Sequence, residues 1–229
     1  MNALFGEHRA RNIQRLKAPR AAAVAGILFA LLFAASISLI RLNIPADFSG
    51  EASWISTGYR PLRIALVLMP FAVIAFLWFV GVIRDRLGEQ EDQFFATVFF
   101  GSSLLFLAMV CVSMAIAGGI LVAADGTIQE GLDRDSVALA RAVMLQISNV
   151  YALRMAAVFM VSVATIWLRT GVMPRRLALA TYVLALLLLL VVSLNLWVVL
   201  IFPAWVFSVS VFILTTEARS SQQSSPLSG

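Results

Sequence analysis

This sequence has little of the side-chain chemistry from which most active sites are built. It contains one cysteine, Cys111, one histidine, His8, and one lysine, Lys17, among 229 residues. A single cysteine cannot form an internal disulfide, and a single histidine outside the apolar runs excludes a haem held by two histidines or a His-rich zinc site. The sequence therefore predicts no cofactor and no metal ion.

Charge is also scarce. Charged residues make up 13% of the chain and hydrophobic residues 61%, a balance far from that of soluble globular domains. The longest apolar runs contain no aspartate or glutamate, and they reach the roughly 20 residues that a helix needs to cross a bilayer. The composition predicts an all-α integral membrane protein with no soluble domain.

The apolar runs predict a six-helix transmembrane bundle over residues 21–215. Its spans are expected at about 21–40, 62–83, 95–123, 149–168, 177–193 and 197–215. The run 177–215 is either one strongly tilted helix or two spans, and two spans fit better because Ser193 to Asn195 supply a break. Residues 1–20 form a basic tail, and the polar residues 216–229 are expected to be disordered.

The distribution of basic residues predicts the orientation. Eleven lie in the tails and the loops on one side: Arg9, Arg11, Arg15, Lys17, Arg20, Arg84, Arg86, Arg169, Arg175, Arg176 and Arg219. Five lie on the other side: Arg41, Arg60, Arg63, Arg134 and Arg141. Because basic loops are retained inside, both termini are predicted to be cytoplasmic. Short scattered basic segments offer no groove for nucleic acid, and the preference for arginine and alanine suggests a bacterial plasma (inner) membrane.

Arg154 is the exception to this pattern, because it lies within the run SNVYALRMAAVFM, residues 148–160. If the span begins near Asn149, the guanidinium lies roughly 7–8 Å inside it and can snorkel back to the headgroups. The helix also extends upstream as an amphipathic segment, because apolar residues recur at helical spacing at Val137, Ala140, Met144, Ile147 and Tyr151.

The alternative interpretation turns Arg154 into the bundle as a candidate ligand or ion-pair site. No span carries a carboxylate to neutralise it, so the partner would be an anionic ligand, a lipid headgroup or an acidic residue of the outer loops. Those loops supply Asp47, Glu51, Asp125, Glu130, Asp133 and Asp135.

A second candidate site is the turn RDRLGEQEDQFF, residues 84–95. Its charged residues are Arg84, Asp85, Arg86, Glu89, Glu91 and Asp92. Arginines at one helix end and carboxylates at the next helix start suit the two helix dipoles. The density of charge also predicts a docking surface for a protein partner.

Small residues and prolines within the spans predict packing features. Pro70 and Pro203 are expected to kink their helices. Gly101, Gly118 and Gly119 are expected to let the third span pack closely at the centre of the bundle. Serine hydroxyls of the spans are expected to bond carbonyls of their own or a neighbouring helix.

Three functions fit these patterns. The first is a non-enzymatic accessory or assembly subunit that acts by helix packing and loop contacts, with anionic lipid headgroups and a protein partner or further copies of itself around it. The second is a small transporter or channel for an anionic or amphipathic solute, with Arg154 in the pathway. The third is a lipid-acting membrane enzyme that uses loop carboxylates.

Overall fold

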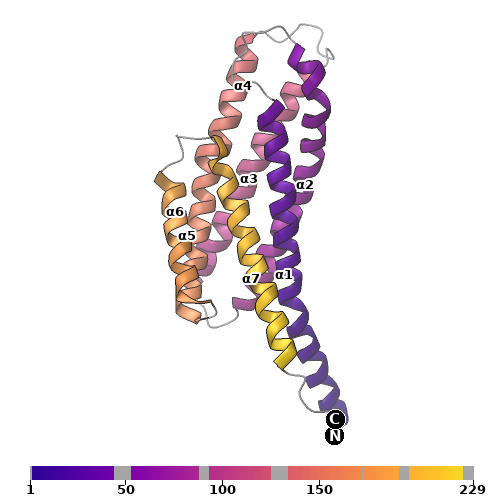
Figure 1. Cartoon of the computed structure of the whole chain (residues 1–229), viewed down its shortest axis with the longest axis vertical. Helices are drawn as coiled ribbons and strands as arrows, with labels where there is room; N and C mark the ends of the chain where they lie inside the picture. The colour runs from indigo at the N-terminus through magenta and orange to yellow at the C-terminus, as the bar shows by residue number, and fades with distance from the viewer. Residues whose placement is uncertain are drawn as a thin grey trace.

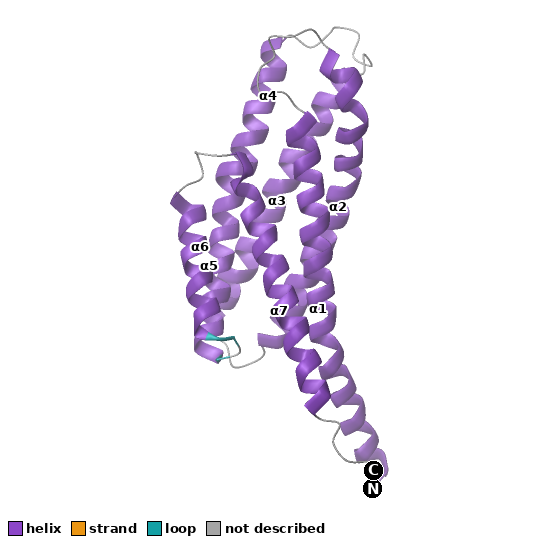
Figure 2. Cartoon of the chain, viewed as in Figure 1, coloured by secondary structure: helices purple, strands orange, loops and turns teal. Residues whose placement is uncertain are grey.

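The computed structural model describes residues 2–43, 53–87, 93–124, 134–171, 173–190 and 196–223. Within these ranges all the secondary structure is helical and no strand occurs (Figure 2). The α-helices are α1 (Asn2–Asn43), α2 (Ser53–Leu87), α3 (Gln93–Ala124), α4 (Arg134–Gln146), α5 (Leu153–Thr170), α6 (Arg175–Leu190) and α7 (Ile201–Gln223). A π-helical segment, η2 (Ile147–Ala152), joins α4 to α5, and a 3₁₀ segment, η3 (Leu196–Leu200), precedes α7.

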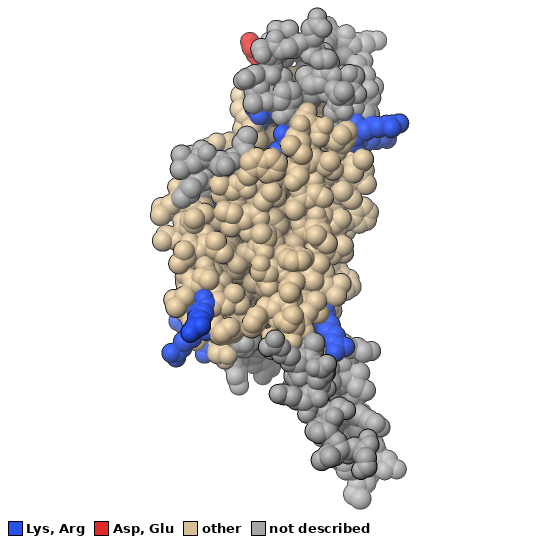
Figure 3. All heavy atoms as spheres, in the orientation of Figure 1, with Lys and Arg blue, Asp and Glu red and all other residues tan. Residues whose placement is uncertain are grey.

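Five stretches of helix are long and apolar enough to cross a membrane. They are Arg20–Asn43, Arg60–Arg84, Phe95–Ala123, Asp135–Thr170 and Trp197–Thr216. Figure 3 shows the resulting apolar belt, with basic side chains at its two rims. The predicted all-α membrane bundle is confirmed, and the chain is a multi-pass membrane protein.

The helices are aligned along one axis, and α1 begins at the same end of the bundle at which α7 finishes (Figure 1). We call the opposite end, where α1 finishes, the Arg41 end, and the end where α2 finishes the Arg84 end. Helix α1 packs between α2 and α7, while α5 packs against α3 and α6.

Several predicted boundaries differ from the structure. The fourth span is part of a continuous 36-residue helical stretch, Asp135–Thr170. Helix α7 continues to Gln223, so the disorder expected from residue 216 onward is wrong for that part, because no glycine or proline ends the helix before Pro226. Helix α6 ends at Leu190 and η3 begins at Leu196, so the predicted break at Ser193 to Asn195 lies outside the described residues.

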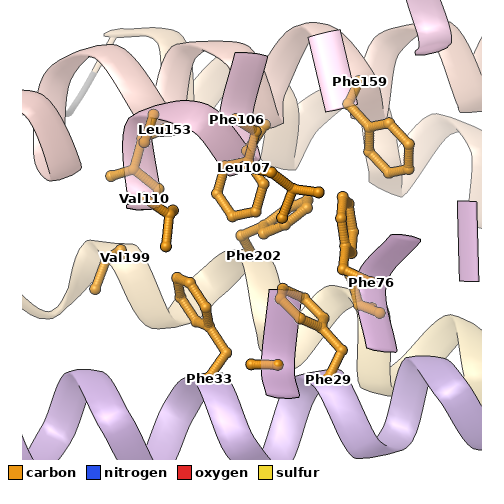
Figure 4. Packing of buried hydrophobic residues seen from close by; sticks show 14 of the residues in the cluster. Phe29, Phe33, Phe76, Phe106, Leu107, Val110, Leu153, Phe159, Val199 and Phe202 are labelled. Atoms are coloured by element: carbon orange, nitrogen blue, oxygen red, sulfur yellow. The ribbon is translucent and has the colours of Figure 1, made fainter. Parts of the chain in front are cut away.

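Phenylalanine rings fill the centre of the bundle. Eight are fully buried: Phe29, Phe33, Phe76, Phe79, Phe99, Phe106, Phe159 and Phe202. The Phe76 ring lies 4.6 Å from that of Phe29 and 5.5 Å from that of Phe106, centroid to centroid. Figure 4 shows six of them converging from several helices: Phe29, Phe33, Phe76, Phe106, Phe159 and Phe202. The core is therefore a packed aromatic cluster shared by α1, α2, α3, α5 and α7.

Helix α3 is not enclosed at the centre of the bundle, contrary to the prediction. The stretch Asp135–Thr170 is the most buried of the five candidate spans, whereas α3 presents exposed residues such as Leu105 and Val112. A methyl group added at Gly101 or Gly119 would meet no atom within 4 Å. Small residues in a sequence show that close packing is allowed, but not which way they face.

The close helix approach occurs instead at Gly26 of α1. A Cβ atom built there would lie 2.1 Å from Ser210 Oγ of α7 and 2.9 Å from Cδ2 of the Phe79 ring of α2. Ser210 is fully buried, and its Oγ has no hydrogen-bond partner in the described part of the chain. Gly26 thus sets the spacing of three helices.

Replacing Gly26 with alanine is expected to lower the free energy of unfolding by about 1–3 kcal/mol, because the methyl group would overlap Ser210 and Phe79. The measurement is SDS titration of the detergent-solubilised protein, followed by circular dichroism. Gly81→Ala is the matched control, since a methyl group there meets no atom within 4 Å. Adding Ser210→Gly should restore part of the loss. Equal stability of Gly26→Ala and Gly81→Ala would contradict the close approach.

Candidate functional site

The π-helical segment η2, with the sequence ISNVYA, is the main irregularity in the described helices of the membrane region. A π turn contains an extra residue, so it widens the helix and alters the partners of nearby carbonyl groups. Two serines donate to the carbonyls just before it. Ser113 Oγ of α3 donates to the Met144 carbonyl at 3.1 Å, and Ser148 Oγ donates to the Leu145 carbonyl at 3.3 Å.

This segment shifts the buried face of the helix by one residue. The predicted apolar face continued from Met144 to Ile147 and Tyr151, but the structure buries Ser148 and Ala152 after Met144. The Tyr151 side chain is 53% exposed. Tyr151 therefore lies off the buried face, because simple α-helical spacing does not include the extra residue of a π turn.

The same shift decides the position of Arg154. Continued at α-helical spacing, the face that holds Ile147 and Tyr151 would include residue 154. In the structure the Arg154 side chain is exposed on the outside of α5. The interpretation in which it faces the bundle interior does not hold for this chain. Its suggested partners Asp47, Glu51, Asp125, Glu130 and Asp133 lie outside the described residues.

One arginine at a helix end, predicted only to set the topology, does turn inward. Arg41, near the end of α1, is half-buried, and its Nη2 donates to Asn149 Oδ1 in η2. Its Nη1 is buried and has no hydrogen-bond partner among the residues described. Arg141 of α4 is half-buried as well. The contact joins residues 108 positions apart, so local sequence patterns could not reveal it.

The Arg84 end of the bundle uses arginines differently. The Arg84 guanidinium lies 4.6 Å from the centroid of the Phe100 ring, and that of Arg169 lies 4.5 Å from the centroid of the Phe95 ring. These cation–π contacts hold the ends of α2 and α5 against the start of α3, and because both arginines are exposed each contributes about 0.5–1 kcal/mol.

Arg84, the first residue of the predicted docking turn, thus contacts Phe100 of the same chain. Asp85 and Arg86 lie in the last turn of α2, and Glu89, Glu91 and Asp92 lie outside the described residues.

The two prolines differ in their surroundings. Helix α2 continues without a break through Pro70, whose side chain is exposed. Pro203 is the third residue of α7 and follows the 3₁₀ segment η3. Because η3 runs directly into α7, Pro203 is inside a continuous helical stretch and its missing N–H removes one possible backbone hydrogen bond. Pro203 thus lies just after the point where the 3₁₀ segment changes to an α-helix, and the expected kink there stays a prediction.

Serine hydroxyls bond helix carbonyls as predicted. Ser102 donates to the Phe99 carbonyl at 3.1 Å and Ser162 to the Val158 carbonyl at 2.9 Å, while Ser113 reaches a neighbouring helix. Ser210 is the exception noted above. These bonds satisfy polar groups inside the membrane and leave few side-chain hydroxyls for chemistry.

Polar side chains also join α5, α6 and α7. Thr165 Oγ1 and the Tyr182 hydroxyl lie 2.6 Å apart, and the Trp205 indole N–H donates to Thr181 Oγ1 at 2.9 Å. In the parts of the chain that the structure describes, no group of three or more histidine, cysteine, aspartate and glutamate residues could hold a metal ion.

No protein-family model, curated protein or solved structure matches this chain. Its function is therefore argued from the geometry alone.

Proposed function

We propose that this protein is a non-catalytic membrane subunit that serves the assembly or support of a larger membrane complex. The observation that carries the proposal is the packed phenylalanine cluster. Phe76 contacts rings of four other helices through Phe29, Phe106, Phe159 and Phe202. A bundle filled in this way acts through its surfaces, because aromatic rings occupy the centre of its described part.

The same core weighs against a transporter. A solute route through a membrane protein needs polar groups, water or a gap along the bundle axis. Here the axis is occupied by fully buried aromatic rings, and Arg154, the residue suggested for such a route, is exposed on the outer side of α5. A pathway would have to form between separate molecules.

The orientation is part of the proposal. The Arg84 end carries Arg84, Arg169, Arg175 and Arg176 near the ends of its helices. By the positive-inside rule this end, with both chain termini, faces the cytoplasm. The arginine-rich composition fits a bacterial plasma membrane.

Purification from native membranes in mild detergent tests the proposed role. We expect a protein to copurify in a fixed ratio to the wild-type chain and to be lost when Glu89, Glu91 and Asp92 are neutralised to Gln, Gln and Asn. These changes leave the Arg84 contact with Phe100 in place.

The matched control neutralises Arg60 and Arg63, which are exposed at the opposite end, and it should keep the partner. Mass spectrometry of the purified samples gives the ratio. A monodisperse protein without a partner, together with solute flux in proteoliposomes, would overturn the proposal in favour of a transporter.

A further inference from the structure

Arg41 is placed where an unsatisfied guanidinium is costly. It lies within the candidate span Arg20–Asn43, is half-buried, and one of its two terminal nitrogens is buried with no hydrogen-bond acceptor in the described ranges. A buried cation without an anionic partner is strongly disfavoured in a low-dielectric region. Arg41 Nη1 is therefore a donor that an anion would satisfy.

Asn149 adds donors at the same point. Its Oδ1 accepts the hydrogen bond from Arg41 Nη2, and this fixes the amide so that its Nδ2 group can donate to an anion. The π-helical segment is what brings Asn149 to this position, between the buried residues Ser148 and Ala152. Widened turns of this kind frequently occur at functional sites.

Arg141 supplies further positive charge on the same stretch of helix. It lies about two turns before Asn149, and its side chain is half-buried. The carboxylate of Asp135, one of the described residues of α4, is exposed. Among the described residues of this region, the half-buried side chains are therefore cationic or neutral.

Depth favours a lipid as the source of the anion. Arg41 lies two residues before the end of its candidate span, at the level where headgroup phosphates meet the hydrocarbon. Arg154 is exposed about one turn further into the span, and its long side chain can snorkel back to that boundary. A guanidinium binds phosphate oxygens through two parallel N–H donors.

We propose that Arg41 and Asn149 form a site for the phosphate of a phospholipid headgroup. The bound phosphate accepts from Arg41 Nη1 and Asn149 Nδ2 and neutralises the half-buried guanidinium. It ties α1 to η2 at the Arg41 end. This inference does not depend on the proposed role as a subunit, because the site lies within one chain.

The test compares lipid binding by native mass spectrometry of the purified chain after delipidation, with short-chain phosphatidylglycerol as the probe. We expect Arg41→Gln to weaken binding at least tenfold. Arg60→Gln is the matched control, since it removes an exposed arginine at the same end, and it should leave binding within twofold of wild type.

Two further variants keep the test decisive if Arg41→Gln fails to fold. Arg41→Lys retains the charge without the planar fork, and Asn149→Leu removes the amide. Each is expected to weaken binding several-fold. Equal binding by these variants and wild type, or an equal loss with Arg60→Gln, would overturn the proposal.

Competition between inorganic phosphate and phosphatidylglycerol shows whether the bound phosphate belongs to a lipid or to a soluble ion. If the site takes a lipid, millimolar inorganic phosphate should not displace phosphatidylglycerol. If inorganic phosphate displaces it and alone raises the thermal unfolding midpoint of wild type but not of Arg41→Gln, the site takes a soluble phosphate and the lipid assignment is wrong. No binding of either probe to wild type would also overturn it, and would point to an acidic loop residue as the partner of Arg41.

Discussion

Replacing Phe76 with alanine is expected to lower the free energy of unfolding by about 3 kcal/mol or more, because the cavity would remove the contacts of one ring with five others. Those rings belong to Phe29, Phe79, Phe106, Phe159 and Phe202. Helices inside a lipid bilayer gain little from the hydrophobic effect, so the loss reports packing itself. SDS titration monitored by circular dichroism measures it.

Phe71→Ala is the control for this experiment. Phe71 lies on the same helix, but its side chain is 58% exposed toward the surroundings of the bundle. Removing that ring leaves no internal cavity, and the change in the free energy of unfolding should stay within about 0.5 kcal/mol. If the two variants lose similar amounts, the aromatic cluster does not hold the bundle together.

Deleting Val150 is expected to have the second large effect, because it removes the extra residue of the π-helical segment. A regular α-helix in its place would rotate the chain before it relative to α5 by one residue position, about 100°. Either Arg154 would then turn toward the core or Ser148 and Asn149 would leave their positions. Burying an arginine in a membrane helix costs about 2.5–3.5 kcal/mol, and losing the Arg41 to Asn149 hydrogen bond adds about 1–3 kcal/mol.

Thermal unfolding in detergent, followed by size-exclusion chromatography, measures this loss. Val150→Ala is the length-matched control, and because Val150 is only half-buried it should lower stability by about 1 kcal/mol at most. A deletion variant as stable as Val150→Ala would contradict the structural role assigned to the π turn.

The candidate site contains buried positions and contacts that the sequence patterns did not predict. The spacing from Val137 to Met144 gave the correct face of α4, but the π turn then moved the buried positions to Ser148 and Ala152. Arg154 stood out because of its apolar neighbours, yet it is exposed. The sequence indicated only that Arg41 is a charge at a helix end, because its partner Asn149 is far from it in the sequence.

The glycines in the sequence likewise did not identify where helices approach closely. Gly101 and Gly119 share a helix with further small residues, yet an added methyl group would meet no atom within 4 Å. Gly26, which has no glycine near it in the sequence, lies where α1 meets Ser210 and Phe79. A glycine permits close approach, but only the neighbouring helices decide whether an approach takes place.

The sequence by itself determined the class of this protein and most of its helices. Long apolar runs without carboxylates require membrane-crossing helices, because backbone groups in lipid must be bonded within the chain. These properties are local and follow from composition and length. The tertiary structure decided which faces are buried, that Phe76 lies at the centre of the core, and that Arg41 meets Asn149. Those features depend on helix rotation and on contacts between distant segments, and in a uniformly apolar chain no periodic pattern specifies either one.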